Sequence, residues 1–593
     1  MLNLSSTRWF VAALALFSTI AAAADVDRSP VDLVLGPDET WLVTINQTAD
    51  SVSLVRIADG KVLHELPVGD HPTGIALLPD GNELLVACHH SGELQRIKVD
   101  GEQLVLAQTI PIGFLPHSIA IAKDGNTAYV SLTASAEVAV VDLRANEVAQ
   151  KIAVGRWPRH LALSSDCQTL AVGASGDRGI SVIDLATGKQ KFHETFMGLN
   201  IGQMQIGKDQ EHVYTTWMTY RGFPLNIQNI RQGWVLASRV GRVRLDQGSR
   251  REAMALDPRG QAIADPYGFA LTSDEERMVV AAGGSHELLV YRAKDLPLKA
   301  VGSDDHVPDD VLRDKDRFYR IQLGGRPQGI KIGRDDQTVY VANYFNSSVQ
   351  VVDLKSRSLQ REIALGAAPE PSLARQGEMI FYDAKRSLDQ WYSCATCHFE
   401  GGTNAIQMDT LNDGTPFTSK TVLPLYHLSE TGPWTWHGWQ KDLAAGMRKS
   451  LIDTMHGPQP TDHDVQAVLA YLRELKPAPN PFVARDGKLT EAQERGRQLF
   501  VGKTANCIQC HTGPQFTDGE IHEVGLESRK DAYRGFNTPT LRNVYMKSQL
   551  LHDGRANSLA EVLKDAHSPE KVAGERKLTE EEVRDLVEYL RTL

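Results

Sequence analysis

The segment LPHSIAIAKDGNTAYVSLTASAEVAVVD, residues 115–142, decides the fold of the first two-thirds of the chain. It opens on a Leu-Pro pair and holds three short apolar runs, separated by the turn sequence KDGN and by a polar loop. Short runs rich in Val, Ile, Ala and Tyr with turn residues between them are typical of antiparallel β-strands. A fourth run ends on Val154-Gly155, so one unit contains four strands.

Related units recur along the chain. Prolines that open them stand at residues 30, 72, 116 and 158, spaced by 42 to 44 residues, and again at 266 and 327. A degenerate unit with an insertion, around residues 200–256, brings the number to seven. Four short strands per repeat of about 40 to 45 residues are the unit of a β-propeller, whose closure protects the sheet edges. We therefore predict an all-β, seven-bladed β-propeller over residues 25–366.

The repeats resemble the YVTN-type propeller family, with Val339-Tyr340-Val341-Ala342-Asn343 as the nearest match to its name. That resemblance implies a fold rather than an activity, because this scaffold serves binding, structural and enzymatic proteins alike. Six residues near the starts of the units are expected at the mouth of the central channel: Asp32, His71, His117, Arg159, His160 and Arg326. These histidines and the pair His89-His90 raise the question of a metal such as copper. Their different offsets from the aligned prolines favour hydrogen-bonded loop histidines over one convergent metal site.

The last third of the chain contains Cys-x-x-Cys-His twice, at Cys394–His398 and Cys507–His511, 113 residues apart. This motif attaches a c-type haem through two thioethers and supplies the histidine as iron ligand. A redox or zinc CxxC pair is the alternative. Similar sequences precede both copies, Gly377-Glu378-Met379-Ile380-Phe381 and Gly496-Arg497-Gln498-Leu499-Phe500, and each lobe ends in a helical pattern with a Tyr-Leu pair. We therefore predict two mainly α-helical cytochrome c lobes that share one order of helices and haem motif.

Haem of this type is attached outside the cytoplasm, so the chain must be exported. Arg8 precedes an apolar run over residues 9–20, which is followed by Ala21-Ala22-Ala23-Ala24 and Asp25. This order predicts a cleaved signal peptide over residues 1–24, with an uncleaved N-terminal anchor as the alternative, and it predicts the periplasm as the location. No later run reaches eighteen apolar residues, so we expect no membrane span.

The net charge of the chain limits its binding partners, and its cysteine content limits its disulfides. A formal net charge of −11 argues against nucleic-acid binding and is compatible with docking a basic electron carrier. Two cysteines, Cys88 and Cys167, remain outside the motifs, and their positions in non-neighbouring repeats make a disulfide between them unlikely to form. The Pro/Ala stretch within residues 367–372 is expected to be a short, stiff linker. It separates the propeller, which we expect to fold on its own, from a first lobe over 373–481 and a second over 482–593.

Residues 373–593 resemble the di-haem cytochrome c peroxidases and the related MauG proteins. The resemblance rests on the segment 536–544, FNTPTLRNV, on Leu551-His552-Asp553-Gly554-Arg555, and on the segment 433–439, PWTWHGW, in the first lobe. It implies two covalently bound haems. Their attachment residues and iron ligands are Cys394, Cys397 and His398 for the first haem, and Cys507, Cys510 and His511 for the second.

The same resemblance implies how the two haems divide the work. Hydrogen peroxide is expected to react at the first haem, while the second haem passes electrons across a tryptophan, which is Trp436 here with Trp434 as the fallback. It also implies a small periplasmic electron donor, either a cytochrome c or a cupredoxin, and a Ca²⁺ ion between the lobes.

Departures from the family pattern fall at positions that matter for chemistry. The family's distal glutamate aligns with His456, which is a candidate for either the acid/base group or an axial ligand of the first iron. The distal glutamine position falls on Gly446, and His437 and Trp439 replace the usual neighbours of the tryptophan. No histidine lies between Phe399 and Tyr426, where many relatives place a removable ligand.

On the second haem the family's axial methionine aligns with Ala566. The neighbouring His567 is therefore our preferred axial ligand, and Met546 is a weaker candidate. An imidazole in place of a thioether should lower the potential of that haem.

Two functions follow from these residues. In the first, the protein is a peroxidase-type or MauG-like oxidoreductase whose propeller docks a partner or a protein substrate. In the second, both irons are six-coordinate and the protein is a non-catalytic electron-transfer or docking protein. A propeller that is itself a dehydrogenase-like domain is a third idea, for which the sequence shows no cofactor signature.

Overall fold

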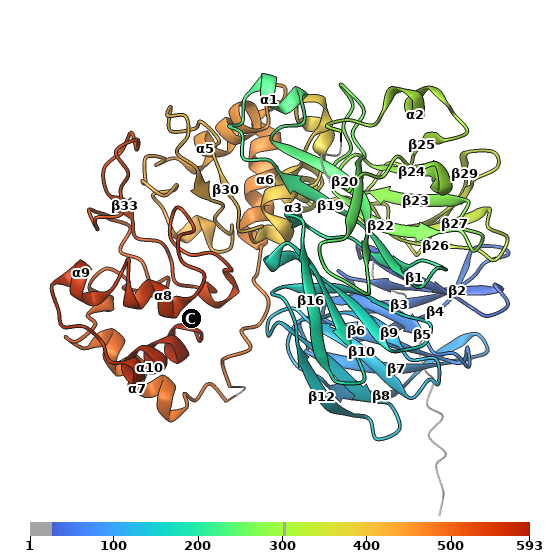
Figure 1. Cartoon of the computed structure of the whole chain (residues 1–593), viewed down its shortest axis with the longest axis horizontal. Helices are drawn as coiled ribbons and strands as arrows, with labels where there is room; N and C mark the ends of the chain where they lie inside the picture. The colour runs from blue at the N-terminus through green and yellow to red at the C-terminus, as the bar shows by residue number, and fades with distance from the viewer. Residues whose placement is uncertain (1–25, 301–303, 485) are drawn as a thin grey trace, which may run out of the picture.

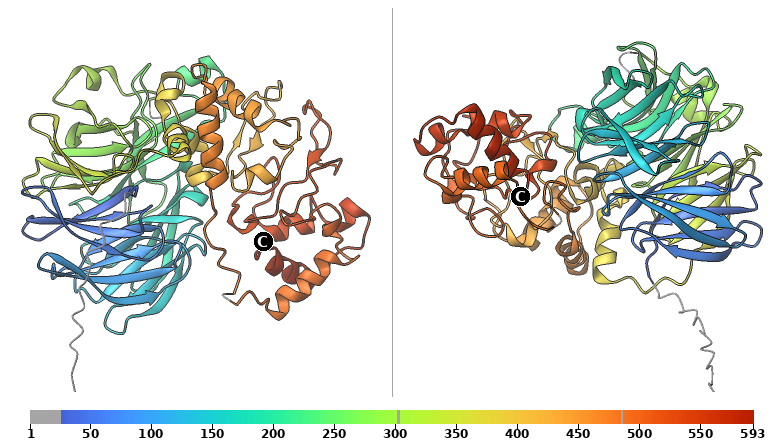
Figure 2. Two further views of the ribbon diagram at one scale, coloured as in Figure 1. Left: turned by 180° about the vertical axis from the view of Figure 1, so that it is seen from behind. Right: turned by 90° about the horizontal axis from the view of Figure 1, so that it is seen from below.

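The computed structural model describes residues 26–300, 304–484 and 486–593, so the predicted signal peptide lies outside the described residues. A ring of β-sheets forms one side of the molecule, and two mainly helical lobes form the other (Figure 1). The first lobe lies between the ring and the second lobe, and the chain ends in the second lobe (Figure 2). No helix among the described residues is long and apolar enough to cross a membrane.

Seven antiparallel sheets form the ring, each built from consecutive strands. The first three sheets contain β1 (Pro30–Leu35), β2 (Trp41–Asn46), β3 (Ser51–Arg56), β4 (Lys61–Pro67); β5 (Pro72–Leu77), β6 (Glu83–Cys88), β7 (Glu93–Asp100), β8 (Gln103–Pro111); and β9 (Pro116–Ile121), β10 (Thr127–Leu132), β11 (Glu137–Asp142), β12 (Glu147–Ala153). The fourth and fifth contain β13 (Pro158–Leu163), β14 (Thr169–Ala174), β15 (Gly179–Asp184), β16 (Lys189–Thr195); and β17 (Gly198–Leu199), β18 (Met204–Ile206), β19 (His212–Tyr220), β20 (Leu236–Arg244), β21 (Arg251–Ala255). The last two contain β22 (Pro266–Leu271), β23 (Arg277–Ala282), β24 (Glu287–Arg292), β25 (Phe318–Gln322); and β26 (Pro327–Ile332), β27 (Thr338–Asn343), β28 (Ser348–Asp353), β29 (Ser358–Ala364).

The predicted seven-bladed propeller is therefore confirmed, and the degenerate repeat is the irregular fifth blade. Short polar hydrogen bonds explain the recurring turn sequences. Asp124 accepts a bond from the amide of Asn126 at 2.9 Å, and Gly125 takes the left-handed conformation with φ of 70° that the tight turn requires. The acidic end of the third strand acts in the same way, because Asp142 accepts the amides of Arg144 and Ala145.

The ring closes by packing rather than by sharing a strand. Strand β1 lies against β26, and an apolar cluster joins Leu33 and Leu42 of the first blade to Val349 and Ile363 of the seventh. Nearby polar groups reinforce the seam: the amide of Arg28 donates to Ser347 Oγ at 3.2 Å. Closure of this kind buries the outer faces of the two terminal blades against each other.

The two lobes contain short helices, of which the longer ones are α3 (Leu373–Phe381), α5 (Leu443–Lys449), α6 (Asp462–Glu474), α7 (Glu491–Val501), α8 (Leu559–Lys564) and α10 (Glu580–Leu590). In each lobe one helix from before the haem motif crosses the closing helix, α3 against α6 and α7 against α10. A glycine permits each crossing: a Cβ on Gly377 would lie 1.9 Å from the Ala467 carbonyl oxygen, and one on Gly496 would lie 2.0 Å from that of Asp585. The two lobes thus share one plan, as their sequences predict.

The propeller and the first lobe share one apolar cluster. Met218 and Leu236, from β19 and β20, are fully buried in the same cluster as Phe381, Trp391 and Leu469 of the lobe. The second lobe touches the ring as well, since the Trp157 ring donates Nε1–H to the Met546 carbonyl at 3.1 Å. A propeller that folds on its own would therefore expose its side of this shared apolar cluster to water.

We expect a fragment of residues 25–366 to unfold at a lower temperature than the propeller in the full chain, because removing the lobe exposes the β19–β20 side of this cluster to water. A fragment of residues 25–481 keeps the cluster and is the matched control. Differential scanning calorimetry of the three proteins checks this. An identical unfolding temperature for the short fragment and the full-length propeller would show that the shared cluster contributes nothing.

Candidate functional site

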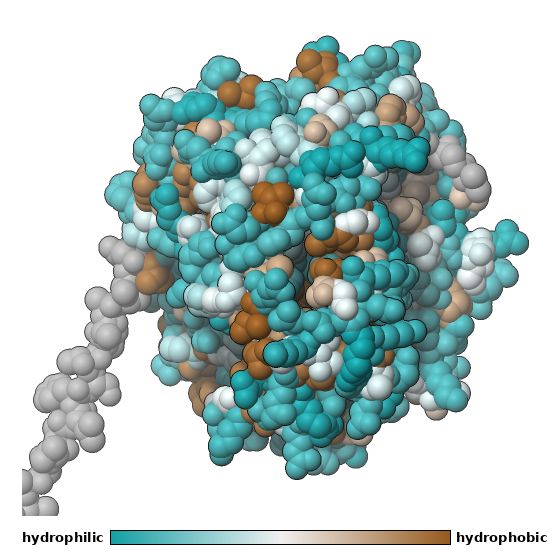
Figure 3. Space-filling model, turned by 90° about the vertical axis from the view of Figure 1, so that its left-hand side faces the viewer, coloured by the Kyte–Doolittle hydropathy of each residue, from teal (hydrophilic) through white to brown (hydrophobic). Residues whose placement is uncertain are grey.

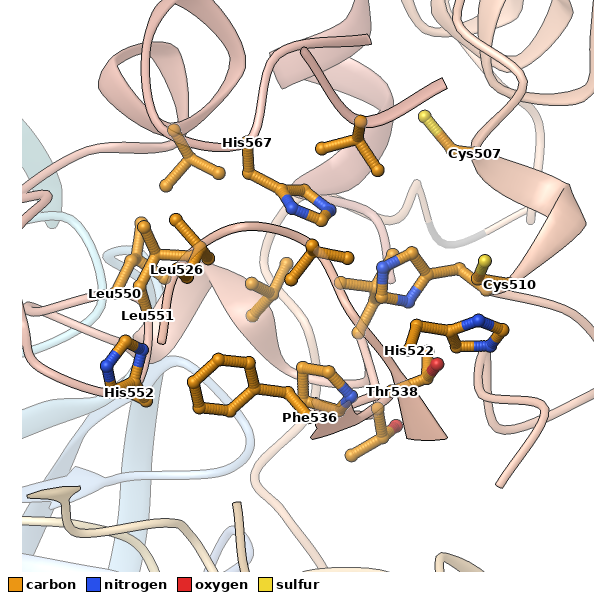
Figure 4. Close-up of a pocket in the computed structure, with 18 of the residues that line it drawn as sticks. Cys507, Cys510, His522, Leu526, Phe536, Thr538, Leu550, Leu551, His552 and His567 are labelled. Atoms are coloured by element: carbon orange, nitrogen blue, oxygen red, sulfur yellow. The ribbon is translucent and has the colours of Figure 1, made fainter. Parts of the chain in front are cut away.

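The second haem motif lines a cavity of about 510 Å³ in the second lobe. Cys507 begins the short helix η8 (Cys507–Gln509), and Cys510 and His511 follow it. The lining is mostly apolar, with Leu526, Phe536 and Leu550 among its members, and His567 enters from the side opposite Phe536 and Thr538 (Figure 4). On the side of the molecule that carries this lobe, apolar side chains gather around a hollow in a mainly hydrophilic face (Figure 3). A cavity of this volume and lining suits a large flat cofactor.

The imidazoles of His511 and His567 face each other in this cavity. Their ring centres are 6.4 Å apart and their planes are inclined at 79°. Metal–imidazole bonds of about 2 Å place two opposed nitrogens roughly 4 Å apart, and each ring centre lies roughly 1 Å beyond its nitrogen, which gives about 6 Å between centres. The observed separation therefore fits one iron held between the two rings.

A hydrogen bond on His511 and the burial of both rings favour metal binding by the two imidazoles. His511 Nδ1 donates to the Phe516 carbonyl at 3.1 Å, which leaves Nε2 with its lone pair for a metal. Burial lowers the pKa of His511 to about 4 and also lowers the pKa of His567, so both imidazoles are neutral at pH 7. A neutral imidazole is the form that coordinates iron.

Lys547 is a cation in the same cavity. It lines the wall, and burial lowers the pKa of its ammonium group to about 8. Within the described part of the chain it has no carboxylate partner within 4.0 Å. An apolar cavity with one unpaired ammonium group suits a cofactor that is flat, apolar and edged by carboxylates, as a haem is.

The first haem motif lies in the first lobe against the propeller. Cys394–Cys397 form the one-turn helix α4, whose start is fixed by a reciprocal pair of bonds between Ser393 and Thr396. The propeller holds this turn directly: Asp265, immediately before β22, accepts hydrogen bonds from Ser393 Oγ and Thr396 Oγ1, both at 2.6 Å. Ser393 and Thr396 are buried and Asp265 is half-buried, and desolvation raises the pKa of Asp265.

Two methionine sulfurs cover the thiols of the first motif. Met455 Sδ lies 3.5 Å from Cys394 Sγ, and Met408 Sδ lies 3.4 Å from Cys397 Sγ. Burial lowers the pKa of His398 to about 4, so this imidazole too is neutral and able to bind a metal. The His398 imidazole therefore suits a metal, while thioether attachment at this motif would require both thiols to be uncovered.

His456 follows Met455 at the end of the π-helical turn η7 (Ser450–Thr454), with a φ of 47°. It is therefore adjacent in sequence to the thioether that touches Cys394. Its Nε2 atom is buried and has no hydrogen-bond partner among the described residues. A buried imidazole nitrogen without a partner requires a ligand or a proton acceptor to satisfy it.

Trp436 lies at the boundary between the lobes. Its indole Nε1–H donates to the Thr421 carbonyl at 2.8 Å, and its ring lines the second cavity together with the segment 421–424 of the first lobe. The same segment reaches the first motif, because the backbone of Leu423 lies close to the His398 ring. Trp434 instead donates to the Leu428 carbonyl and does not belong to the described lining of the cavity.

Other predicted residues are placed as follows. The Met546 carbonyl accepts a hydrogen bond from Trp157 Nε1, and Met546 is not among the described residues that line the second cavity. Cys88 and Cys167 are both free, as expected. Cys510, Asp518 and His522 lie close enough together to hold a metal ion, but a thioether at Cys510 would use that sulfur.

The channel histidines come closer together than their sequence offsets indicate. Ring contacts of 4.2 to 6.0 Å connect His71, His89, His90, His117 and His160 into one buried cluster. The histidines come together in spite of their different offsets from the aligned prolines, because some of them lie on strands and others lie on the loops between the strands. Within the described part of the chain, no three of their nitrogens lie within 4.8 Å of one another, so the cluster does not present a ready metal cage.

Asp265 and Lys547 were not singled out by the sequence. Asp265 belongs to a recurring residue-Pro pair at the start of a blade, and only the docking of the first lobe gives it a partner. Lys547 lies seven residues after Thr540 in the peroxidase-like segment, and nothing in its local pattern distinguishes it from a solvent-exposed lysine.

Comparison with known proteins gives two family matches. Residues 8–215 match the YNCE-like β-propeller, and residues 491–592 match the di-haem cytochrome c peroxidase family. The hydrazine synthase subunit gamma of Kuenenia stuttgartiensis is 29% identical over 281 residues, covering 37% of this chain and 77% of its own. The methylamine utilization protein MauG of Methylorubrum extorquens is 27% identical, covering 38% and 78%, and the cytochrome c551 peroxidase of Nitrosomonas europaea is 23% identical, covering 37% and 79%.

The matched C-terminal region contains the second CxxCH motif, the cavity around it and His567. The matched N-terminal region contains the first four blades of the ring. The chain thus joins a region that matches the YNCE-like β-propeller model to a C-terminal region that matches the di-haem cytochrome c peroxidase model, and these matches support a haem peroxidase-type oxidoreductase.

Proposed function

We propose that the protein is a periplasmic di-haem c-type oxidoreductase that reduces hydrogen peroxide at the first haem and draws electrons through the second. The observation that carries this proposal is the placement of two CxxCH motifs in like-built lobes, with Trp436 and the 421–424 segment between them. When bound, the haems supply one-electron redox chemistry and an iron site for peroxide. The two-electron reduction of peroxide to two waters also consumes two protons.

His456 is the residue we assign to proton transfer at the first haem. Peroxide cleavage requires a proton to move from one oxygen to the other, and an imidazole placed beside the peroxide can accept and then donate it. The unpartnered Nε2 is the atom for this task. If His456 were instead bound to the iron, peroxide would be excluded and the protein would be an electron-transfer module.

At the second site, His511 and His567 are the proposed pair of axial ligands, and Lys547 is the proposed counter-charge for a haem carboxylate. Two imidazole ligands favour a lower reduction potential than an imidazole with a thioether. Ile508, inside the second motif, is 40% exposed, so a haem held by this motif would be reachable from the protein surface. A small cytochrome c or cupredoxin is the proposed donor there, and the net charge of −11 favours a basic one.

The propeller is proposed to dock a partner or a protein substrate. Its ring contacts both lobes, through Asp265 at the first motif and through Trp157 at the segment before the second cavity. A protein bound to the ring would therefore be held beside the haem region. Calcium between the lobes stays a proposal that rests on family resemblance alone.

We expect His567→Ala to convert the second haem from a six-coordinate low-spin iron to a five-coordinate or water-bound one, because the imidazole opposite His511 is lost. Met546→Leu is the matched control and should leave the spectrum unchanged, since Met546 lies outside the cavity lining. Optical and electron paramagnetic resonance spectra of the oxidised proteins distinguish the two. A low-spin signal that persists in His567→Ala and disappears in Met546→Leu would reverse the ligand assignment.

A further inference from the structure

Two arginines of the propeller reach toward the first lobe at the mouth of the central channel. The guanidinium carbon of Arg159, on β13, lies 3.8 Å from the centre of the Phe399 ring. That of Arg326, just before β26, lies 3.7 Å from the centre of the Tyr382 ring. Both aromatic residues belong to the first lobe, and Phe399 directly follows the histidine of the first haem motif. The two cations are thus held between the ring of blades and the first haem motif.

Neither guanidinium group has an anionic partner. Among the described residues, no carboxylate oxygen lies within 4.0 Å of either one, and neither side chain donates a hydrogen bond to a protein acceptor. Other stacked arginines of this protein are paired, such as Arg375 with Glu378 and Arg357 with Asp316. Both arginines are half-buried, and a guanidinium group carries five N–H donors that no protein acceptor takes up here.

Uncharged histidine and tyrosine side chains lie beside the two arginines. His117 and His160 lie at the channel mouth with ring centres 5.0 Å apart, and Tyr267 lies 5.1 Å from His160. Burial lowers the pKa of His160 to about 3 and raises the pKa of Tyr267, so both are uncharged at pH 7. His117 Nδ1 and His160 Nε2 are buried without partners. The channel behind them has a volume of about 370 Å³ and a largely polar wall.

Three carboxylates are also close, and none forms an ion pair with Arg159 or Arg326. Glu378, whose charge influences Arg326, is already paired with Arg375. Asp265 already accepts bonds from Ser393 and Thr396. Glu400, two residues after the motif histidine, influences the charge of both arginines but lies outside ion-pair distance of each. The mouth therefore contains two guanidinium groups with free donors and one carboxylate beside them.

We propose that Arg159 and Arg326 bind a small anion, a carboxylate or an oxyanion, between the channel mouth of the propeller and the first haem motif. Planar guanidinium groups match the two oxygens of such an anion. The anion has two sources with the same chemistry: a carboxylate of the haem attached at Cys394 and Cys397, or a free small molecule that enters the channel. The proposal does not depend on peroxidase activity, because an electron-transfer protein would have the same cations.

The test uses the purified two-haem protein and isothermal titration calorimetry with sodium formate and with inorganic phosphate. If the anion is free, the wild type binds one of them, and Arg159→Gln and Arg326→Gln each weaken binding by about tenfold or more, as expected for a lost charge-assisted bond. Glu400→Gln should tighten binding, since it removes the neighbouring negative charge. Arg357→Gln, which alters a stacked but paired arginine, is the control and should change nothing.

If the anion is a haem carboxylate, the wild type binds neither probe, and the variants act on the haem. Arg159→Gln and Arg326→Gln should then lower the midpoint potential of the first haem relative to Arg357→Gln, because loss of a nearby positive charge favours the oxidised iron. Arg159→Lys keeps the charge and should keep the potential. The proposal is overturned if the wild type binds no probe and the two glutamine variants leave both haem potentials unchanged, with circular dichroism showing that each variant is folded.

Discussion

Cys507→Ala is expected to leave most of the purified protein with one covalently bound haem in place of two. The double variant, Cys507→Ala with Cys510→Ala, is expected to leave all of the protein with one covalently bound haem. Each haem of this type is held by two thioethers, and among the described residues that line the second cavity these cysteines are the only thiols. Loss of the haem also leaves a cavity of about 510 Å³ without a filling, so the lobe should lose stability.

Mass spectrometry of the intact protein under denaturing conditions measures the number of attached haems. Cys88→Ala is the matched control, because Cys88 is a buried cysteine of β6 outside both motifs, and it should retain two haems. The equivalent change at Cys394 should remove the first haem and leave the second. Two haem masses on the double variant would show that the second motif does not attach haem.

His456→Ala is expected to slow the reaction of the half-reduced protein with hydrogen peroxide by roughly 10²- to 10⁴-fold, the usual loss when a proton-transfer group is removed. The spin state of the first haem should not change. Stopped-flow spectroscopy of the wild type and the variant measures the rate, and His456→Gln, which keeps a polar side chain without the titrating group, should be as slow.

The opposite sign identifies the competing role. If His456 is an iron ligand, its removal opens the site, produces a high-spin spectrum and accelerates the reaction with peroxide. The protein would then be an electron-transfer module in its resting form. An unchanged rate together with an unchanged spectrum would make His456 a structural residue.

The sequence predicts most of the fold because its determinants are local. The turn at Asp124 and Gly125 is fixed by residues two positions apart, so the repeat can be read directly from the chain. The crossings at Gly377 and Gly496 are also predictable, since a small residue before a buried aromatic recurs in both lobes. The prediction of cofactor attachment rests on five consecutive residues in each lobe.

The parts of the site that the sequence does not reveal depend on docking between distant segments. Asp265 and Thr396 are separated by 131 positions, and no local pattern connects a blade of the propeller to a haem motif. The histidine cluster is also hidden from the sequence, because closure of the propeller brings together histidines that stand at different positions within their repeats. The missing partners of Arg159 and Arg326 become visible only when every nearby carboxylate has been located.

The cover over the first motif has a consequence for how the protein matures. Met455 and Met408 lie against the two thiols, and Asp265 of the propeller accepts a hydrogen bond from the turn that carries these thiols. An enzyme that forms thioethers needs both thiols in the open. If the first motif carries a haem as proposed, we expect it to be attached before this lobe packs on the propeller, so that modification of the chain precedes closure of the interface.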